Sequence, residues 1–307
     1  MKNKITEICK NAGFQLVKFT KAEELTIEKK YLESWIEEGR NADMKWMEKY
    51  IDKRTNPSLI LENVKSVISL ALLYDTPVIH REDENLPKIS RYAWGERDYH
   101  KIIKSKLKQI CNEIELLSPN IKTKFYVDDG PVMDKVWAVR SGLGWMGKNT
   151  NVINPEYGSY FFLSEIFINI EFEYDEPIED YCKNCRLCLI ECPTGALYDE
   201  YKLDANLCIS YQTIENRSEI PNEINLNGWI FGCDICQEVC PYNSKGVFTD
   251  EKLFFPREEL TNKSYDDLLN YTEKKFDETF SGTPIKRTKY SGWIRNLKKA
   301  KSELKNN

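Results

Sequence analysis

The stretch "YCKNCRLCLIECPTGAL", residues 181–197, decides the fold of the second half of the chain. Its cysteines Cys182, Cys185, Cys188 and Cys192 follow the spacing C-x2-C-x2-C-x3-C, and a proline comes directly after the last one. This spacing is typical of bacterial ferredoxins with two [4Fe–4S] clusters, in which three cysteines hold one cluster and the fourth reaches the other. The stretch therefore predicts a ferredoxin-like module that needs a second cysteine motif.

The second motif is "GCDICQEVCPYN", residues 232–243, which contains only three cysteines. Because the last cysteine of each motif crosses to the other cluster, each cluster takes ligands from both motifs. The second cluster then lacks one thiolate, and the cysteine in "LDANLCISYQTIE" is the only other one inside the module. The predicted ligands of the first cluster are Cys182, Cys185, Cys188 and Cys240. Those of the second cluster are Cys192, Cys208, Cys233 and Cys236.

Zinc is the alternative metal, because paired C-x2-C motifs also form zinc sites. A zinc site stops at four ligands, whereas this module offers eight cysteines and an unbroken ferredoxin motif, so iron–sulfur clusters are favoured. Two clusters at short range carry single electrons, and the module is expected to deliver them to another group. Cys9 and Cys111 lie apart, at apolar positions of helical patterns, and are predicted to be buried, inert thiols.

The chain of 307 residues is 41% hydrophobic and 30% charged, which is typical of a globular protein of about two domains. Its first residues lack the apolar core of a signal peptide, and no uncharged apolar run is long enough for a membrane helix, so we expect a cytoplasmic protein, a monomer by default. The net charge is −5, yet residues 281–307 carry eight basic residues against the single acid Glu303. This basic tail is either a nucleic-acid footprint or a solvated helix end.

Helical and strand patterns alternate along the first half. Apolar spacing predicts helices over residues 4–12 and 99–117, and apolar runs predict strands in "FQLVKF", "SVISLALLY", "KTKFYVDD" and "GSYFFLSEIFINI". We expect a mixed fold, α+β or α/β, with three parts: a sheet domain with flanking helices (1–174), the ferredoxin-like module (175–250) and a short helical basic tail (251–307).

The segment "PVMDKVWAVRSGLGWMGKN" contains glycines that partly match a phosphate-binding loop and a dinucleotide-binding motif. Both motifs require a strand before the glycines, and here a helix precedes them, so neither nucleotide site is expected. Two interpretations remain open. The glycines either form a turn that ends the helix, or they allow the backbone to approach a bulky cofactor closely.

The sequence resembles the epoxyqueuosine reductases, cobalamin-dependent iron–sulfur enzymes that complete the queuosine modification of tRNA. The resemblance covers nearly the whole chain and is carried by "KRTNPSLILENVKSVI", "ISRYAWGERDYHK", "DDGPVMDKVWAVRSGLGWMGKN", "PEYGSYFFLSEI", the cysteine motifs and "GTPIKRTKYSGWIRNLKKA". It implies a corrin-binding N-terminal domain related to reductive dehalogenases, followed by a two-cluster module.

By position, Asp134 in "PVMDKVW" matches the family's proton donor. An aspartate with its ordinary pKa of about 3.9 is ionised at neutral pH, so this role requires a raised pKa. The alternative is a surface carboxylate that pairs with Lys135 or Arg140. The incomplete cobalamin motif around His100 implies a packing or hydrogen-bonding group there and not a cobalt ligand. The residues expected to line the corrin are Arg54, Pro57, Arg97, Tyr99, Asp134, Ser159 and Gln212.

The reaction implied by the resemblance removes the epoxide oxygen of epoxyqueuosine at the wobble position of tRNA, the last step of queuosine biosynthesis. It consumes two electrons and two protons, and the clusters would reduce cobalamin to cob(I)alamin, which attacks the epoxide. The sequence does not identify the external electron donor. The basic tail would contact phosphates, and the candidates for stacking on an RNA base are Tyr92, Trp94, Tyr211 and Trp293.

Three alternatives belong to other classes. A cobalamin-dependent reductase of a small molecule, similar to reductive dehalogenases, would share the architecture but not act on tRNA. A ferredoxin fused to a flavin domain would show flavin absorbance, and a zinc-stabilised RNA-binding module would be colourless. An absorbance spectrum with cobalamin and a tRNA assay together separate these proteins.

Overall fold

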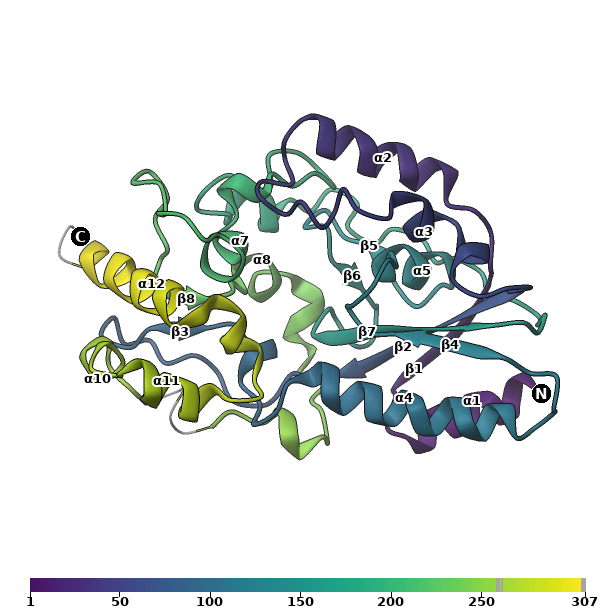
Figure 1. Cartoon of the computed structure of the whole chain (residues 1–307). Helices are drawn as coiled ribbons and strands as arrows, with labels where there is room; N and C mark the ends of the chain where they lie inside the picture. Colours follow the sequence, from purple (N-terminus) through teal and green to yellow (C-terminus); the bar gives the residue numbers. More distant parts are fainter. Residues whose placement is uncertain (258–259, 261, 305–307) are drawn as a thin grey trace.

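The computed structural model describes residues 1–257, 260 and 262–304. Figure 1 shows two parts side by side. One part contains the N-terminus and a sheet with helices on both faces. The other contains the cysteine module and the C-terminal helices, and the cysteine-rich loops lie where the two parts meet.

The main sheet has the order β1-β2-β7-β4, and every neighbouring pair is antiparallel. Its strands are β1 (Leu16–Lys21), β2 (Ser66–Leu73), β4 (Thr123–Tyr126) and β7 (Phe161–Ile168). All of β2 is buried, because helices cover both faces of the sheet. The mixed fold predicted from the sequence is confirmed, and the antiparallel pairing makes this part an α+β arrangement.

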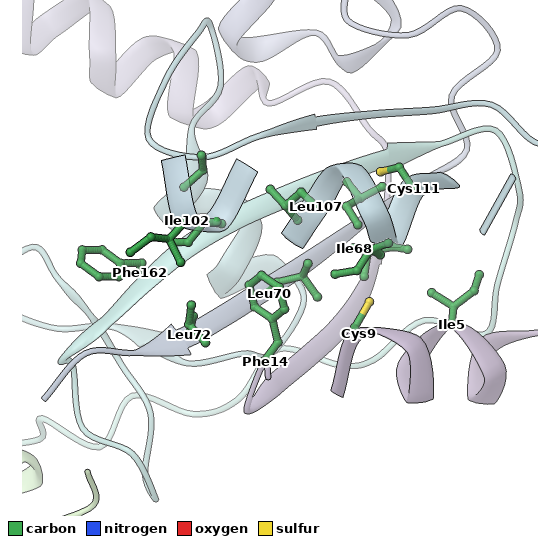
Figure 2. Close-up of a cluster of buried hydrophobic side chains, with 14 of the residues drawn as sticks. Ile5, Cys9, Phe14, Ile68, Leu70, Leu72, Ile102, Leu107, Cys111 and Phe162 are labelled. Atoms are coloured by element: carbon green, nitrogen blue, oxygen red, sulfur yellow. The ribbon is translucent and has the colours of Figure 1, made fainter. Parts of the chain in front are cut away.

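One face of the sheet packs against α1 (Lys2–Asn11) and α4 (Tyr99–Glu115). Figure 2 shows this core, in which side chains from both helices meet those of β2 and Phe162 of β7. Cys9 and Cys111 lie here, and burial raises the pKa of their thiols to about 12 and about 11. Such thiols remain protonated at neutral pH, which confirms the prediction of buried, inert cysteines.

The opposite face packs against α5 (Asp134–Arg140), with α2 (Thr26–Glu37), α3 (Ile51–Thr55) and η1 (Pro57–Leu59) nearby. Trp137 of α5 meets Phe167 of β7 edge to face, with ring centroids 6.1 Å apart. Because successive residues of a strand point to opposite faces, Glu165 shares this face with Phe167, while Ser164 points to the α1/α4 side. The α5 helix begins at Asp134.

The glycine segment after α5 is a turn and a tight hairpin. Gly142 has φ +71°, and a Cβ atom there would lie 2.0 Å from the carbonyl oxygen of Glu176. The hairpin joins β5 (Trp145–Met146) to β6 (Val152–Ile153). The glycines therefore end a helix and let two backbone segments of the protein touch, which confirms the interpretation as a turn. The close approach to a cofactor stays a prediction.

The second part consists of short elements around its own apolar core. A two-residue strand β3 (Lys88–Ile89) pairs in parallel with β8 (Trp229–Phe231), and η2 (Arg91–Ala93) follows β3. The elements of the cysteine module are α6 (Leu187–Ile190), η3 (Ala205–Leu207), α7 (Ile209–Ile214), α8 (Ile235–Glu238) and η4 (Pro241–Lys245).

The C-terminal region is helical, as predicted. Its elements are η5 (Lys252–Phe254), α10 (Tyr265–Leu269), α11 (Glu273–Phe280), η6 (Pro284–Thr288) and α12 (Lys289–Glu303). Trp293 and Leu297 of α12 are fully buried in the core that also contains β8 and α7. The tail is therefore packed onto the cysteine module. In the described part of the chain, no helix combines the length and apolarity needed to cross a membrane.

Candidate active site

Four cysteines gather near the protein surface, and we call Cys182, Cys185, Cys188 and Cys240 the outer quartet. Burial, and then the charges of the other three members, raise the pKa of Cys188 to about 11, which places the four thiols close together. Cys185 is exposed to solvent. The residues grouped here are the predicted ligands of the first cluster, although one of them comes from the second motif.

The other four cysteines, Cys192, Cys208, Cys233 and Cys236, form an inner quartet. Burial, followed by the charges of Cys208 and Cys192, raises the pKa of Cys236, and Cys188 of the outer quartet also contributes. The two quartets are therefore neighbours. No three Cys, His, Asp or Glu side chains of the described residues converge tightly enough to hold a single metal ion, so the thiols are spaced more widely than around zinc, where each Zn–S bond is about 2.3 Å.

The outer quartet receives a hydrogen bond from an indole. The Nε1–H of Trp145, on β5, donates to the sulfur of Cys182 at 3.3 Å. The Trp145 ring is held edge to face by Tyr181 and Tyr242, with centroid distances of 5.2 and 4.8 Å. If Cys182 holds a cluster, this hydrogen bond would stabilise its more negative, reduced form.

A cavity of about 350 Å³ adjoins the inner quartet, and all four inner cysteines line it. Its walls come from α7, α8, the loop after Cys192 and the β5–β6 turn. The apolar lining residues include Met44, Leu197, Leu203, Ile209, Ile214 and Ile235. The polar ones include Tyr92, Lys135, Asn149, Asn151, Ser210 and Gln237. The cavity thus offers apolar walls with amide and hydroxyl groups between them, next to the inner thiols.

The start of α5 lies at the edge of this cavity. Lys135 lines it and donates hydrogen bonds to the carbonyl oxygen of Thr150 at 2.9 Å and to Oδ1 of Asn151 at 3.0 Å. Asp134, the preceding residue, is partly buried. Lys135 thus connects the first turn of α5, which begins at Asp134, to the cavity wall.

The carboxyl group of Asp134 is in an unusual environment. Burial raises its pKa to about 6, a nearby charge on Asp128 adds to the rise, and hydrogen bonds partly oppose it. The backbone N–H of Asp128 donates to Oδ1 of Asp134 at 3.3 Å. Arg140 pairs instead with Glu28 at 3.0 Å, and Lys135 is bonded to the β5–β6 turn. The interpretation of Asp134 as a salt-bridged surface carboxylate is therefore wrong.

An aromatic and acidic cluster borders Asp128. The hydroxyl of Tyr99 donates to Asp128, and the Tyr99 ring stacks on Phe162 at 4.0 Å between centroids. His100 Nδ1 lies 2.7 Å from Oδ1 of Asp98. His100 is thus held as a hydrogen-bonding group, as the sequence indicated.

Three of the residues expected to contact the corrin come from the first half of the chain and do not line the cavity. Arg54 is buried, close enough to Asp134 for their charges to interact, and its guanidinium donates to the carbonyl oxygens of Trp46 and Lys49. Pro57 is buried at the start of η1, and Arg97 is exposed.

Besides Asp134, three more expected residues, Tyr99, Ser159 and Gln212, are buried without lining the cavity. Tyr99 is bonded to Asp128. The Ser159 hydroxyl donates to Oε1 of Gln237 at 2.9 Å, and Gln237 lines the cavity. Gln212 donates to the carbonyl oxygen of Asn206 at 2.6 Å and is followed by α7 residues that face the cavity. These side chains support the wall rather than form it.

The stacking candidates separate into two pairs. Tyr92 and Tyr211 line the cavity. Trp94 and Trp293 are buried in the second core, so the prediction that they could stack on an RNA base is wrong.

Much of the positive charge of the tail is bound within the protein. Arg287 pairs with Glu215, and Arg295 donates to the carbonyl oxygens of Gln212 and Asn216. Lys289 and Lys298 are exposed. The basic surface available to a partner is therefore smaller than the sequence suggested.

Comparisons with known proteins agree with this geometry. Residues 54–129 match the family described as epoxyqueuosine reductase QueG, DUF1730, and residues 181–243 match a 4Fe-4S double cluster binding domain. The chain is 40% identical to the epoxyqueuosine reductase of Cellulophaga algicola, over 93% of each protein. The chain belongs to the epoxyqueuosine reductase family. Membership confirms the prediction of an oxidoreductase, and the second match confirms that of a double-cluster module.

Two further members extend the comparison. The epoxyqueuosine reductase of Synechocystis sp. is 45% identical over 84% of this chain and 90% of its own length. A crystal structure of epoxyqueuosine reductase with an epoxyqueuosine-modified stem loop of tyrosine tRNA superimposes with a TM-score of 0.91 at 32% identity. The superposition covers 99% of this chain and 81% of the chain in that crystal structure. The fold is thus that of the epoxyqueuosine reductases.

Two residues of the site escaped sequence reasoning. Trp145 lies in a glycine-rich segment, where only the hairpin brings it to Cys182. Glu165 lies in the middle of the apolar run "FFLSEIFI" and is fully buried. A single carboxylate inside a strand of apolar residues was the available signal, because such a residue is rarely buried without a role.

Proposed function

We propose that this chain reduces epoxyqueuosine to queuosine at the wobble position of tRNA. The observation that carries the proposal is a single cavity lined by the inner quartet and by Lys135, the residue next to Asp134 on α5, in a member of the epoxyqueuosine reductase family. Electrons from the clusters and a proton from Asp134 can then meet at one substrate. The removal of the epoxide oxygen takes two electrons and two protons and releases water.

The two quartets are proposed to hold two [4Fe–4S] clusters, with Cys182, Cys185, Cys188 and Cys240 on the outer one. Cys192, Cys208, Cys233 and Cys236 would hold the inner one. The grouping of thiols from both motifs supports this assignment. The outer cluster would receive single electrons from an external donor, and the inner cluster would pass them into the cavity.

Cobalamin is the proposed cofactor of the cavity. The lining fits its chemistry, because apolar walls suit the faces of a corrin ring, and amide and hydroxyl groups suit its polar rim. When bound, it supplies a cobalt centre that accepts single electrons and acts as a strong nucleophile toward carbon. Met44, Ile209 and Tyr211 would hold its ring, and Asn149 and Gln237 would bind its amide groups.

Asp134 is proposed to donate the proton to the epoxide oxygen as a general acid. Its pKa of about 6 is close to the working pH of a cytoplasmic enzyme, where efficient general acids are found. The N–H of Asp128 orients the carboxyl group from the β4–α5 side. Lys135, fixed to the β5–β6 turn, holds the first turn of α5 in place beside the cavity.

RNA recognition is proposed to combine phosphate contacts from Lys289 and Lys298 with capture of the modified base near Tyr92 and Tyr211. The two lysines are exposed on the C-terminal region, and the two tyrosines line the cavity. A protein acting on tRNA in this way would work in the cytoplasm, as a monomer.

The test is an anaerobic assay of protein reconstituted with iron, sulfide and cobalamin. An anticodon stem-loop with epoxyqueuosine and a chemical reductant are added, and the RNA is digested and analysed by mass spectrometry. The proposal predicts loss of one oxygen atom to give queuosine. A halogenated phenol in the same assay tests the alternative of a small-molecule reductase, and turnover of the phenol without turnover of the RNA would reject the proposal.

A further inference from the structure

Glu165 is a carboxyl group without an ordinary partner. It lies on β7, the third strand of the four-stranded sheet, opposite Ser69 of β2 and Tyr126 of β4, and it is fully buried. Neither of its carboxyl oxygens accepts a hydrogen bond from an N–H or O–H group of the described residues. Burying an ionised carboxylate without a donor or a counter-ion is strongly unfavourable, so such a group remains protonated.

Glu165 meets the carboxyl group of Asp134. The two side chains are in hydrogen-bonding contact across the interface between β7 and α5. Carboxylates only accept hydrogen bonds, so a bond between two carboxyl groups requires a proton on one of them. The contact is therefore a carboxyl pair that shares a proton.

The burial of the two groups decides where the proton lies. Burial, then the charge of Asp134 and the hydrogen bond to it, raises the pKa of Glu165 well above its usual value, whereas that of Asp134 is about 6. Near pH 7 the pair therefore holds one proton, mainly on Glu165, and Asp134 is mainly ionised. A carboxyl pair with separated pKa values is the arrangement that enzymes use to keep one acid protonated at neutral pH.

The charged groups around the carboxyl pair do not remove its shared proton. Asp128 raises the pKa of both members, because its negative charge disfavours ionisation of either one. Arg54 and Lys135 are the cations that interact with Asp134 electrostatically. In the described part of the chain neither forms an ion pair with Asp134 or Glu165, since Arg54 is bonded to backbone carbonyls and Lys135 to the β5–β6 turn.

We propose that Glu165 is the proton reserve of Asp134. This inference rests on the proposed role of Asp134 as the proton donor. The proton of Glu165 passes to Asp134 while Asp134 protonates the substrate oxygen, so the pair loses one proton and both carboxyl groups are left ionised. One proton from water then returns through Asp134, because Glu165 has no contact with solvent. Glu165 is thus a positioning residue that acts through Asp134.

The first test is the pH profile of kcat for Glu165→Gln. The amide has nearly the same size and can donate an N–H to Asp134, but it cannot release a proton. Wild-type activity is expected to persist above pH 7, because the pair retains its proton. In the variant Asp134 alone must carry the proton, so kcat should fall about tenfold per pH unit above pH ~6. Superimposable profiles would overturn the proposal.

Ser164→Ala is the matched control. Ser164 is equally buried on the same strand, its hydroxyl also lacks a partner in the described part of the chain, and it points to the opposite face. This substitution should leave the pH profile unchanged, because it does not touch the carboxyl pair. A profile shifted as in Glu165→Gln would assign the effect to the strand and reject the proton reserve.

The second test needs no turnover and no variant that must remain active. Infrared spectra of the wild-type protein at pH 8 should show the C=O stretch of one buried, protonated carboxylic acid. The band should disappear in Glu165→Gln and remain, shifted, in Asp134→Asn. Absence of the band in the wild type would overturn the inference. If the band is present but epoxyqueuosine is not reduced, the proposed function fails and the carboxyl pair stands.

Discussion

The outer and inner cysteine quartets have the same ligand chemistry in two different surroundings. The outer quartet has an exposed member, Cys185, and receives the N–H of Trp145 on Cys182. The inner quartet lines an apolar cavity and faces Lys135. The thiols are thus alike in type and differ in position. This difference supports the proposed direction of electron transfer, in which electrons enter at the exposed quartet and leave at the cavity.

The largest effect is expected when one proposed ligand is removed from the inner quartet while the outer quartet stays intact. Cys208→Ser should lose the inner cluster, reduce bound iron to about half, and abolish turnover, because electrons no longer reach the cavity. Iron analysis and electron paramagnetic resonance measure the loss. Cys111→Ala is the control, since Cys111 is buried in the sheet core and should leave the iron content unchanged. Full iron content in Cys208→Ser would show that Cys208 is not a ligand.

The next largest effect is expected for Asp134, the proposed proton donor. Asp134→Asn should lower kcat by about 10²- to 10⁴-fold, the usual contribution of a general acid, because the amide has no proton to give. Both clusters and RNA affinity should be retained, as shown by iron content and a binding assay. Asp52→Asn, an exposed aspartate on α3 paired with Lys29, is the control. Wild-type turnover in Asp134→Asn would remove this residue from its role.

A smaller effect is expected for RNA binding. Lys298→Ala should weaken binding several-fold at low salt and reduce the slope of log K against log salt by about one, the signature of one lost phosphate contact. Lys301→Ala is the matched control, because Lys301 lies on the same helix but is paired with Asp266. Equal effects of the two substitutions would show that the contribution is not specific to the exposed lysine.

The smallest effect tests the outer quartet alone. Trp145→Phe removes the hydrogen bond to Cys182 and keeps most of the ring, so the outer cluster should become harder to reduce and its reduction potential should fall. The inner cluster is the internal control, and its potential should not change. A redox titration followed by electron paramagnetic resonance resolves the two. A shift of the inner cluster instead would reverse the assignment of the quartets.

The cysteine sites could be predicted because their information is local. The spacing of the two motifs, with one cysteine moved upstream, was enough to group the eight thiols as the structure does. Asp134 could be selected only by the resemblance, since its raised pKa depends on burial against β7, which no spacing expresses.

Other parts of the site depend on how distant segments pack. Trp293 lies in a basic segment whose sequence is typical of a solvent-exposed helix. In the structure it packs against β8, which lies more than 60 residues earlier in the sequence. Residues Gln212 and Ser159 belong to the expected motifs, yet their side chains point to partners inside the wall. The role of Glu165 could be inferred only from the structure, in which the register of β7 places it on the sheet face that packs against α5. A motif indicates the neighbourhood of a site, and packing decides which side chains face it.

The most direct test is a single-turnover reaction without free reductant. The protein, loaded with clusters and cobalamin, is reduced anaerobically, excess reductant is removed, and a stem-loop with epoxyqueuosine is added while cluster absorbance is followed. We predict that the clusters are reoxidised at the rate at which queuosine forms, and that an unmodified stem-loop leaves them reduced. Clusters that remain reduced in the presence of epoxyqueuosine, or that oxidise equally with the unmodified RNA, would contradict a path from the quartets to the RNA substrate.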